Sequence, residues 1–150
     1  MAYAPRCLVD TNILLRVTGQ NDPHHLVGAS LKELKRQGTE LYFCLQNIAE
    51  FWNVCTRPTT RNGFDLSISE TSQRVESIER TMTFLPDNEL VYSIWRRLVA
   101  ANSVRGVQVH DARLAAIMQA YGINHILTLN VPDFVRYTNL QTIHPGHLKA

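Results

Sequence analysis

Short apolar runs alternate with amphipathic stretches along almost the whole chain, and this alternation constrains the fold more than any other feature. The runs have the length of strands, and the stretches between them have the apolar spacing of helices. Strands that alternate with helices favour an α/β fold with a parallel sheet covered on both faces. The predicted strands are 6–9, 40–44, 83–85, 123–127 and 140–143. The predicted helices are 12–17, 23–36, 45–56, 67–81, 87–101, 109–121 and a short one at 131–137.

The bulk properties are those of a globular protein. A length of 150 residues is sufficient for one domain with its own core, so we expect a single domain over 1–150. The net charge of +2 does not by itself indicate nucleic acid. Three cysteines without a Cys-x-x-Cys spacing, no signal-peptide pattern and no apolar run of membrane-spanning length predict a cytoplasmic protein with free thiols and no membrane association.

Three aspartates stand where predicted strands end or predicted helices begin. Asp10 follows the first strand, Asp111 lies at the start of the helix 109–121, and Asp133 follows the fourth strand. Taken singly, each also suits an ordinary role as a helix cap or first-turn acid.

A fourth acid, Glu50, lies on the helix 45–56, on the side that also carries Gln46 and Asn53. Alone it would be interpreted as a solvent-exposed glutamate, but the same position suits the wall of a polar cleft. The opposite side of this helix is apolar, and we expect it to face the core: Leu45, Ile48, Ala49, Trp52 and Cys55.

The four acids are more informative together. The carboxyl ends of parallel strands share one edge of a sheet, so the three aspartates can meet there while Glu50 reaches them from the side. Carboxylates within about 4–6 Å of one another raise each other's pKa and destabilise the fold unless a cation lies between them. Oxygen ligands of this kind suit Mg²⁺ or Mn²⁺, and phosphodiester hydrolysis is a common chemistry of such ions. The sequence therefore predicts a divalent-metal site.

Four segments that carry these acids span nearly the whole chain: VDTNILLR (9–16), AEFWNV (49–54), HDARLAAIMQAYGI (110–123) and ILTLNVPDF (126–134). In order and spacing they resemble PIN-domain ribonucleases, in particular the VapC-type toxins of prokaryotic toxin–antitoxin pairs. The loop TRPTTRNGFDL (56–66) also resembles a subset of these toxins. The resemblance implies a PIN-like three-layer sandwich with a central, mostly parallel sheet of four to five strands. It also implies a metal-dependent endoribonuclease that cleaves single-stranded or looped RNA, a homodimer, and a small antitoxin protein as partner.

The resemblance assigns the catalytic and metal-binding role to the four acids Asp10, Glu50, Asp111 and Asp133. It assigns the orientation of these acids and of the attacking water to four polar residues: Thr11, Asn12, Thr128 and Asn130. Members of the family differ in whether the residue at Asn130 or the one at Asp133 does more of the work.

Several arginines lie in or near segments that flank the predicted cleft: Arg16, Arg57, Arg61, Arg113 and Arg136. As a group they can neutralise phosphates without reading bases. We place Arg16 and Arg113 at the substrate, and Arg113 is the better candidate because it lies two residues beyond Asp111. For any one arginine, a surface or carboxylate partner is the ordinary alternative.

Other functions stay open at the level of the sequence. A phosphatase could use Asp10 as nucleophile, but the haloacid-dehalogenase pattern requires an aspartate at the position of Asn12. A receiver-like switch phosphorylated at Asp10 would need paired acids near the first strand and a lysine directly after the last strand, and the sequence has neither. A PIN fold that binds RNA or a partner protein without cleavage is a further alternative.

Overall fold

A computed structural model describes residues 6–18 and 26–148 of the chain. The described strands form one five-stranded parallel sheet with the order β3-β2-β1-β4-β5, so β1 lies at its centre. The bounds of the strands are β1 (Arg6–Val9), β2 (Glu40–Cys44), β3 (Thr83–Leu85), β4 (His125–Leu127) and β5 (Gln141–Ile143).

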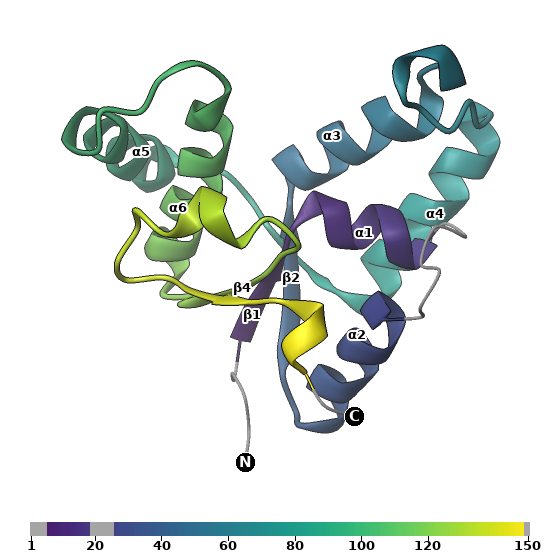
Figure 1. Cartoon of the computed structure of the whole chain (residues 1–150), viewed down its shortest axis with the longest axis horizontal. Coiled ribbons are helices and arrows are strands. Elements are labelled where there is room, and N and C mark those ends of the chain that lie inside the picture. The colour runs from purple at the N-terminus through teal and green to yellow at the C-terminus, as the bar shows by residue number, and fades with distance from the viewer. Residues whose placement is uncertain (1–5, 19–25, 149–150) are drawn as a thin grey trace.

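Helices cover both faces of the sheet, which gives the expected three-layer α/β sandwich (Figure 1). One face is covered by α1 (Thr11–Thr18), α2 (Leu26–Arg36), α3 (Leu45–Thr56) and α4 (Ile68–Thr81). The other is covered by α5 (Glu89–Ala101) and α6 (Val109–Tyr121). Short 3₁₀ turns span Thr59–Arg61, Gly106–Gln108, Val131–Phe134 and Pro145–His147.

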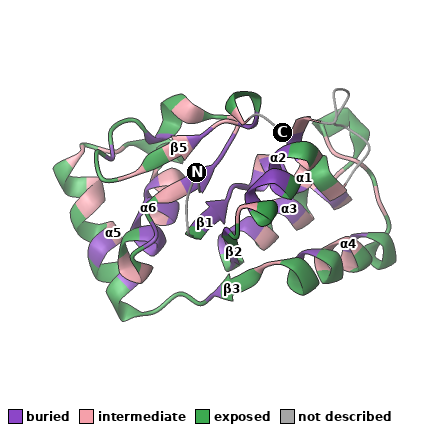
Figure 2. Ribbon diagram, turned by 90° about the horizontal axis from the view of Figure 1, so that it is seen from below, coloured by how far each residue is buried: buried purple, intermediate pink, exposed green. Residues whose placement is uncertain are grey.

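Two hydrophobic clusters fill the spaces between the layers. Successive strand residues point to opposite faces of a sheet, so Val9 packs in the cluster under α1–α4 and Leu8 in the cluster under α5 and α6. Figure 2 shows the buried residues gathered in the strands and in the helix faces that meet them. The sheet and both helical layers are thereby fixed against each other, which holds the carboxyl edge of the sheet in place.

The elements predicted from the sequence are confirmed in order, with differences at their ends. The short helix predicted at 131–137 is only the 3₁₀ turn Val131–Phe134. The helix predicted at 87–101 begins at Glu89, because the side chain of Asn88 caps it by accepting a hydrogen bond from the Val91 amide at 2.9 Å. The strand predicted at 123–127 begins at His125, because the Ile123 amide still donates to Met118 in the turn that ends α6. The predicted first residues of the second helix, 23–25, lie outside the described residues.

The predicted apolar face of α3 is wrong in part. Leu45 is 56% exposed and Ala49 is exposed, whereas Asn47, Phe51 and Cys55 are buried. Asn47 lies inside because its Oδ1 accepts a hydrogen bond from the Cys44 amide at 2.9 Å and so caps the start of the helix. The buried face is consequently centred on 47, 51 and 55.

All three cysteines are free, buried thiols. Burial raises the pKa of Cys7 to about 12 and the pKa of Cys44 to about 11, so both stay protonated at neutral pH. Within residues 6–18 and 26–148, no helix has both the length and the apolar character needed to span a membrane.

Candidate active site

Three of the four predicted acids line one open cleft of about 330 Å³ at the carboxyl edge of the sheet. Asp10 follows β1, Glu50 lies in the second turn of α3, and Asp111 lies in the first turn of α6. Three segments that are distant in the sequence therefore meet at this cleft. The remaining lining residues are Thr11, Asn12, Leu15, Asn53, Val54, Arg57 and Asn130.

Asp10 is held in place by three of the polar residues predicted to orient the acids. Its Oδ1 accepts a hydrogen bond from the Thr11 amide at 2.8 Å. Its Oδ2 accepts one from the Thr128 hydroxyl at 2.8 Å and one from the Asn12 amide group at 3.3 Å. Thr128 reaches Asp10 because β4 pairs with β1.

The pKa of Asp10 lies above its ordinary value. Burial is the main cause, since the residue is only 7% exposed, and the negative charges of Glu50 and Asp133 add to it. The hydrogen bonds from Thr128 and Thr11 act in the opposite direction, because they stabilise the ionised form, but they do not cancel the effect of burial. The cleft thus holds a carboxylate in a position where its ionised form is costly.

Glu50 is oriented by two side chains that donate hydrogen bonds to its carboxylate. The Thr11 hydroxyl donates to Oε2 at 3.0 Å, and Gln46 Nε2 donates to Oε1 at 2.9 Å. Gln46 Nε2 also donates to the carbonyl of His110 at 2.8 Å, so one amide joins α3 to the residue that precedes Asp111.

Sequence reasoning missed two residues at the start of α3, Gln46 and Asn47, and both are buried. Asn47 donates to the Thr11 hydroxyl at 3.3 Å, and that hydroxyl in turn donates to Glu50. The available signal was a pair of adjacent amide residues directly after a buried strand, one of them a single helical turn before Glu50.

Asp111 is half-buried, and its pKa is raised to about 6. Burial is the largest cause, followed by the negative charges of Asp133, Asp10 and Glu50, while the positive charge of Arg136 acts weakly in the opposite direction. All four predicted acids are therefore close enough to influence one another.

The fourth acid is placed differently from the other three. Asp133 is exposed in the 3₁₀ turn Val131–Phe134 and does not belong to the lining of the cleft, although its charge acts on Asp10 and Asp111. Asn130 does line the cleft, and its backbone amide donates to the Thr128 hydroxyl at 2.9 Å. The metal-binding role of all four acids and the orienting role of the four polar residues stay predictions.

The structure does not bring the two arginines predicted at the substrate into the cleft. Arg113 donates to Asp87 Oδ2 at 2.9 Å and lines a separate pocket that also contains Trp95. Arg16 is exposed on α1 and does not line the cleft. Their contact with substrate stays a prediction, and Arg57 is the arginine among the lining residues.

The side chains of the cleft fit a divalent cation that prefers oxygen ligands. A cation between Asp10, Glu50 and Asp111 would offset both the burial and the repulsion that raise the pKa of Asp10 and Asp111. In the described part of the chain, no three His, Cys, Asp or Glu side chains are close enough to hold one ion jointly. Mg²⁺ usually takes only one or two carboxylates and keeps several of its waters, so a Mg²⁺ site does not require three such side chains.

A pH dependence of stability follows from Asp111. Its folded-state pKa of about 6 exceeds the ordinary value of 3.8. Between these pH values the Asp111 carboxyl group is therefore protonated in the folded protein and ionised in the unfolded protein. Stability with chelator present is therefore expected to rise as the pH falls through about 6 and to fall as the pH rises through it. Thermal melting across this range measures the effect. Asp111→Asn should flatten the curve, and an unchanged slope in this variant would contradict the interpretation.

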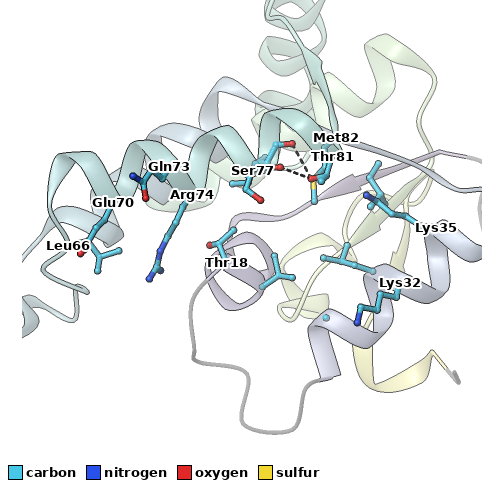
Figure 3. Close-up of a pocket in the computed structure, with 15 residues that line it drawn as sticks. Thr18, Lys32, Lys35, Leu66, Glu70, Gln73, Arg74, Ser77, Thr81 and Met82 are labelled. Atoms are coloured by element: carbon cyan, nitrogen blue, oxygen red, sulfur yellow. Dashed lines mark hydrogen bonds between the residues drawn. The ribbon is translucent and has the colours of Figure 1, made fainter.

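A larger cavity of about 910 Å³ lies between α1, α2 and α4 (Figure 3). Its lining includes apolar residues such as Leu31 and basic residues from two helices, Lys32 and Lys35 of α2 and Arg74 of α4. None of the four predicted acids is part of this lining, so it is distinct from the acidic cleft.

Comparison with known proteins gives one family and a set of similar folds. The family model described as PIN domain matches residues 7–138. No curated protein matches the sequence. Among solved structures, VapBC-1 from nontypeable Haemophilus influenzae is 18% identical with a TM-score of 0.67, and the alignment covers 94% of this chain and 98% of that chain.

Two other solved structures have the same fold. VapBC2 from Rickettsia felis, bound to a DNA fragment from its promoter, is 12% identical with a TM-score of 0.65, covering 93% of this chain and 98% of that chain. Mycobacterium tuberculosis VapC20, described as a Sarcin-Ricin loop cleaving toxin, is 18% identical with a TM-score of 0.54, covering 80% and 86%. At these identities the similarity establishes a common fold.

Proposed function

The chain belongs to the PIN domain family, and on this premise we propose that it is a Mg²⁺- or Mn²⁺-dependent endoribonuclease, the toxin of a toxin–antitoxin pair. The observation that carries the proposal is the convergence of Asp10, Glu50 and Asp111 on one cleft from three separate segments. The fold shared with toxin–antitoxin complexes and with a toxin described as cleaving the Sarcin-Ricin loop supports it.

The residues of the cleft have separable tasks in this proposal. Asp10 and Glu50 hold the cation, each fixed by the hydrogen bonds that Thr11 donates to it. Asp111, whose pKa is raised, is the third acid of the cleft. A cation bound in the cleft would favour its ionised form. A bound divalent cation supplies water activation and neutralises charge on the phosphate. No nucleophilic side chain is assigned, so the proposed reaction is direct attack of water on phosphorus, which breaks the bond from phosphorus to the leaving 3′ oxygen.

We extend the proposal to the organisation and partners of the protein. The whole chain, 1–150, forms one nuclease domain in the cytoplasm, assembles as a homodimer, and binds a small antitoxin protein that covers the groove beside the acids. The antitoxin complexes among the similar structures support the partner. Light scattering on the purified protein tests the dimer, and a monomeric mass at micromolar concentration would refute that part.

Metal-dependent cleavage tests the function directly. With Mn²⁺, the protein should cut a labelled pool of single-stranded RNA, and chelator should stop the reaction. Mn²⁺ should also stabilise the fold by mass action, by about 2.7 kcal/mol at a hundredfold excess over Kd. For a chain of this size, that corresponds to a rise of roughly 5–10 °C in Tm.

Three results would count against this function. Cleavage that survives chelator would refute the role of the metal. An RNA pool that stays intact with Mn²⁺ would favour a PIN fold that binds without cleaving. Release of phosphate from small phosphomonoesters would instead support the use of Asp10 as a phosphatase nucleophile, which the presence of Asn12 two residues later argues against.

A further inference from the structure

Arg57 belongs to the lining of the acidic cleft. It follows the last residue of α3 and lines the cleft together with Asn53 and Val54 of the same helix. Seven residues separate it from Glu50, which is about two helical turns, so the two side chains lie along one face of α3. The lining of the cleft therefore combines three acids with one arginine.

The guanidinium of Arg57 is only partly satisfied by the protein. Its Nη2 donates to the Asn62 carbonyl at 3.2 Å, whereas its Nε is buried and has no hydrogen-bond partner. The ion pairs within the described residues join Arg36 to Glu33 and Arg113 to Asp87, so none involves Arg57. A guanidinium without a carboxylate partner keeps its other donors available for an anion that enters the cleft.

Arg57 is not the counter-ion of the acids. The positive charge that acts on Asp111 is that of Arg136, and no arginine is among the influences on Asp10. Arg57 therefore makes no ion pair with these acids, and its charge is available to an anion that enters the cleft.

The loop after α3 holds Arg57 in position (Figure 1, the dark teal turn beyond the end of α3). Amides of this loop donate to carbonyls at the end of the helix: Phe64 to Val54 at 3.0 Å, Leu66 to Cys55 at 2.8 Å and Asp65 to Arg57 at 3.0 Å.

Gly63 packs directly against the arginine in this loop. A Cβ at this position would lie 2.0 Å from the Arg57 carbonyl oxygen and 2.3 Å from its Cγ. The residue at 63 must therefore be glycine for the stem of Arg57 to keep its place.

We propose that Arg57 is a phosphate-binding residue of this cleft, and that the loop 58–66 presents it to an RNA strand whose neighbouring phosphate lies at the acids. The inference rests on the proposed function and adds to it the residue that positions the substrate. A guanidinium matches the oxygens of a phosphate with two parallel hydrogen bonds, which an ammonium group cannot do. Contact with the backbone carries no base preference, so this residue contributes affinity and register.

Binding of RNA under chelator, where no cleavage is expected, tests the proposal. The probe is a fluorescein-labelled pool of single-stranded RNA, titrated by anisotropy at several KCl concentrations. Arg57→Met should weaken binding roughly 10-fold to 100-fold, as expected for a charge-assisted contact. It should also reduce the slope of log K against log salt by about 0.7, the value for one neutralised phosphate on a single strand. Arg57→Lys should keep the slope and lose part of the affinity.

Arg80→Met is the matched control, because Arg80 is exposed on α4 and does not line the cleft. It should leave the slope unchanged. Gly63→Ala retains the charge but displaces the arginine, so it should weaken RNA binding as Arg57→Met does. The Mn²⁺-induced rise in Tm should persist in Arg57→Met, which separates a substrate contact from damage to the acids.

The outcomes distinguish this proposal from the function on which it rests. Weaker binding by Arg57→Met without a change of slope would show a structural role and overturn the inference, as would an equal loss in Arg80→Met. Wild-type protein that binds RNA but never cleaves it would refute the proposed nuclease function. The slope of log K against log salt would still test the phosphate contact of Arg57. Wild-type protein that does not bind RNA would overturn both.

Discussion

Asp10→Asn is expected to remove almost all cleavage of RNA while the fold stays intact. Positive charge at a phosphoryl group is worth several kcal/mol of transition-state stabilisation, and each 1.36 kcal/mol is a factor of ten, so the rate should fall by at least about 10²- to 10³-fold. The asparagine side chain has the shape of the aspartate side chain. Its oxygen can still accept the hydrogen bond from the backbone amide of Thr11. Single-turnover cleavage with Mn²⁺ measures the loss.

The stability of Asp10→Asn separates this prediction from simple unfolding. Because burial and neighbouring charges raise the pKa of Asp10, its ionised form destabilises the metal-free protein. The variant should therefore melt at the same temperature as wild type or higher with chelator present, and should lose most of the stabilisation by Mn²⁺. Asp65→Asn, the same substitution at an exposed loop position, is the control. Equal cleavage by both variants would contradict the assignment of Asp10.

Phe51→Ala should cause the largest loss of stability among these variants. Phe51 is fully buried in the cluster between the sheet and α1–α4. Truncation of a buried phenylalanine typically costs about 3–5 kcal/mol, out of a total stability of about 5–15 kcal/mol. Urea unfolding, followed by circular dichroism at constant m value, measures the change.

Leu45→Ala provides the comparison, because Leu45 is on the same helix but 56% exposed. Its effect should stay within about 0.5 kcal/mol, the usual range for a surface substitution. Equal losses in the two variants would mean that the inward face of α3 is not the one centred on Asn47, Phe51 and Cys55.

The fold was predictable because its signals are local. Strand length, helical spacing and turn residues such as Gly122, which ends α6 with a φ of +68°, are all visible in short windows of sequence. The buried face of α3 was not predictable in this way, because hydrophobicity alone would place Leu45 inside and Asn47 outside. The hydrogen bond from the Cys44 amide to Asn47 reverses this order, and a contact of that kind has no signature in hydropathy.

The site was predictable in its acids and less so in their surroundings. Asp10, Glu50 and Asp111 lie in segments whose sequence resembles a family, and the structure brings them to one cleft. The side-chain partners depend on contacts between distant segments. Arg113 pairs with Asp87, 26 residues away, and Gln46 reaches the carbonyl of His110, 64 residues away. No local pattern encodes such pairings, so the arginine was predicted at the substrate and the glutamine was missed.

The central place of β1 in the sheet bears on when the protein becomes active during its synthesis. Asp10 is made early, but two groups that fix it are made much later. The Thr128 hydroxyl, which donates to its side chain, lies 118 positions later. The Leu127 carbonyl, which accepts from its backbone amide, lies 117 positions later in β4. A nascent chain that has been translated only to the end of α6 carries Asp10, Glu50 and Asp111 without the strand that holds the first of them. If the acids cut RNA, cleavage is therefore expected to begin only after β4 has been made and has joined the sheet beside β1.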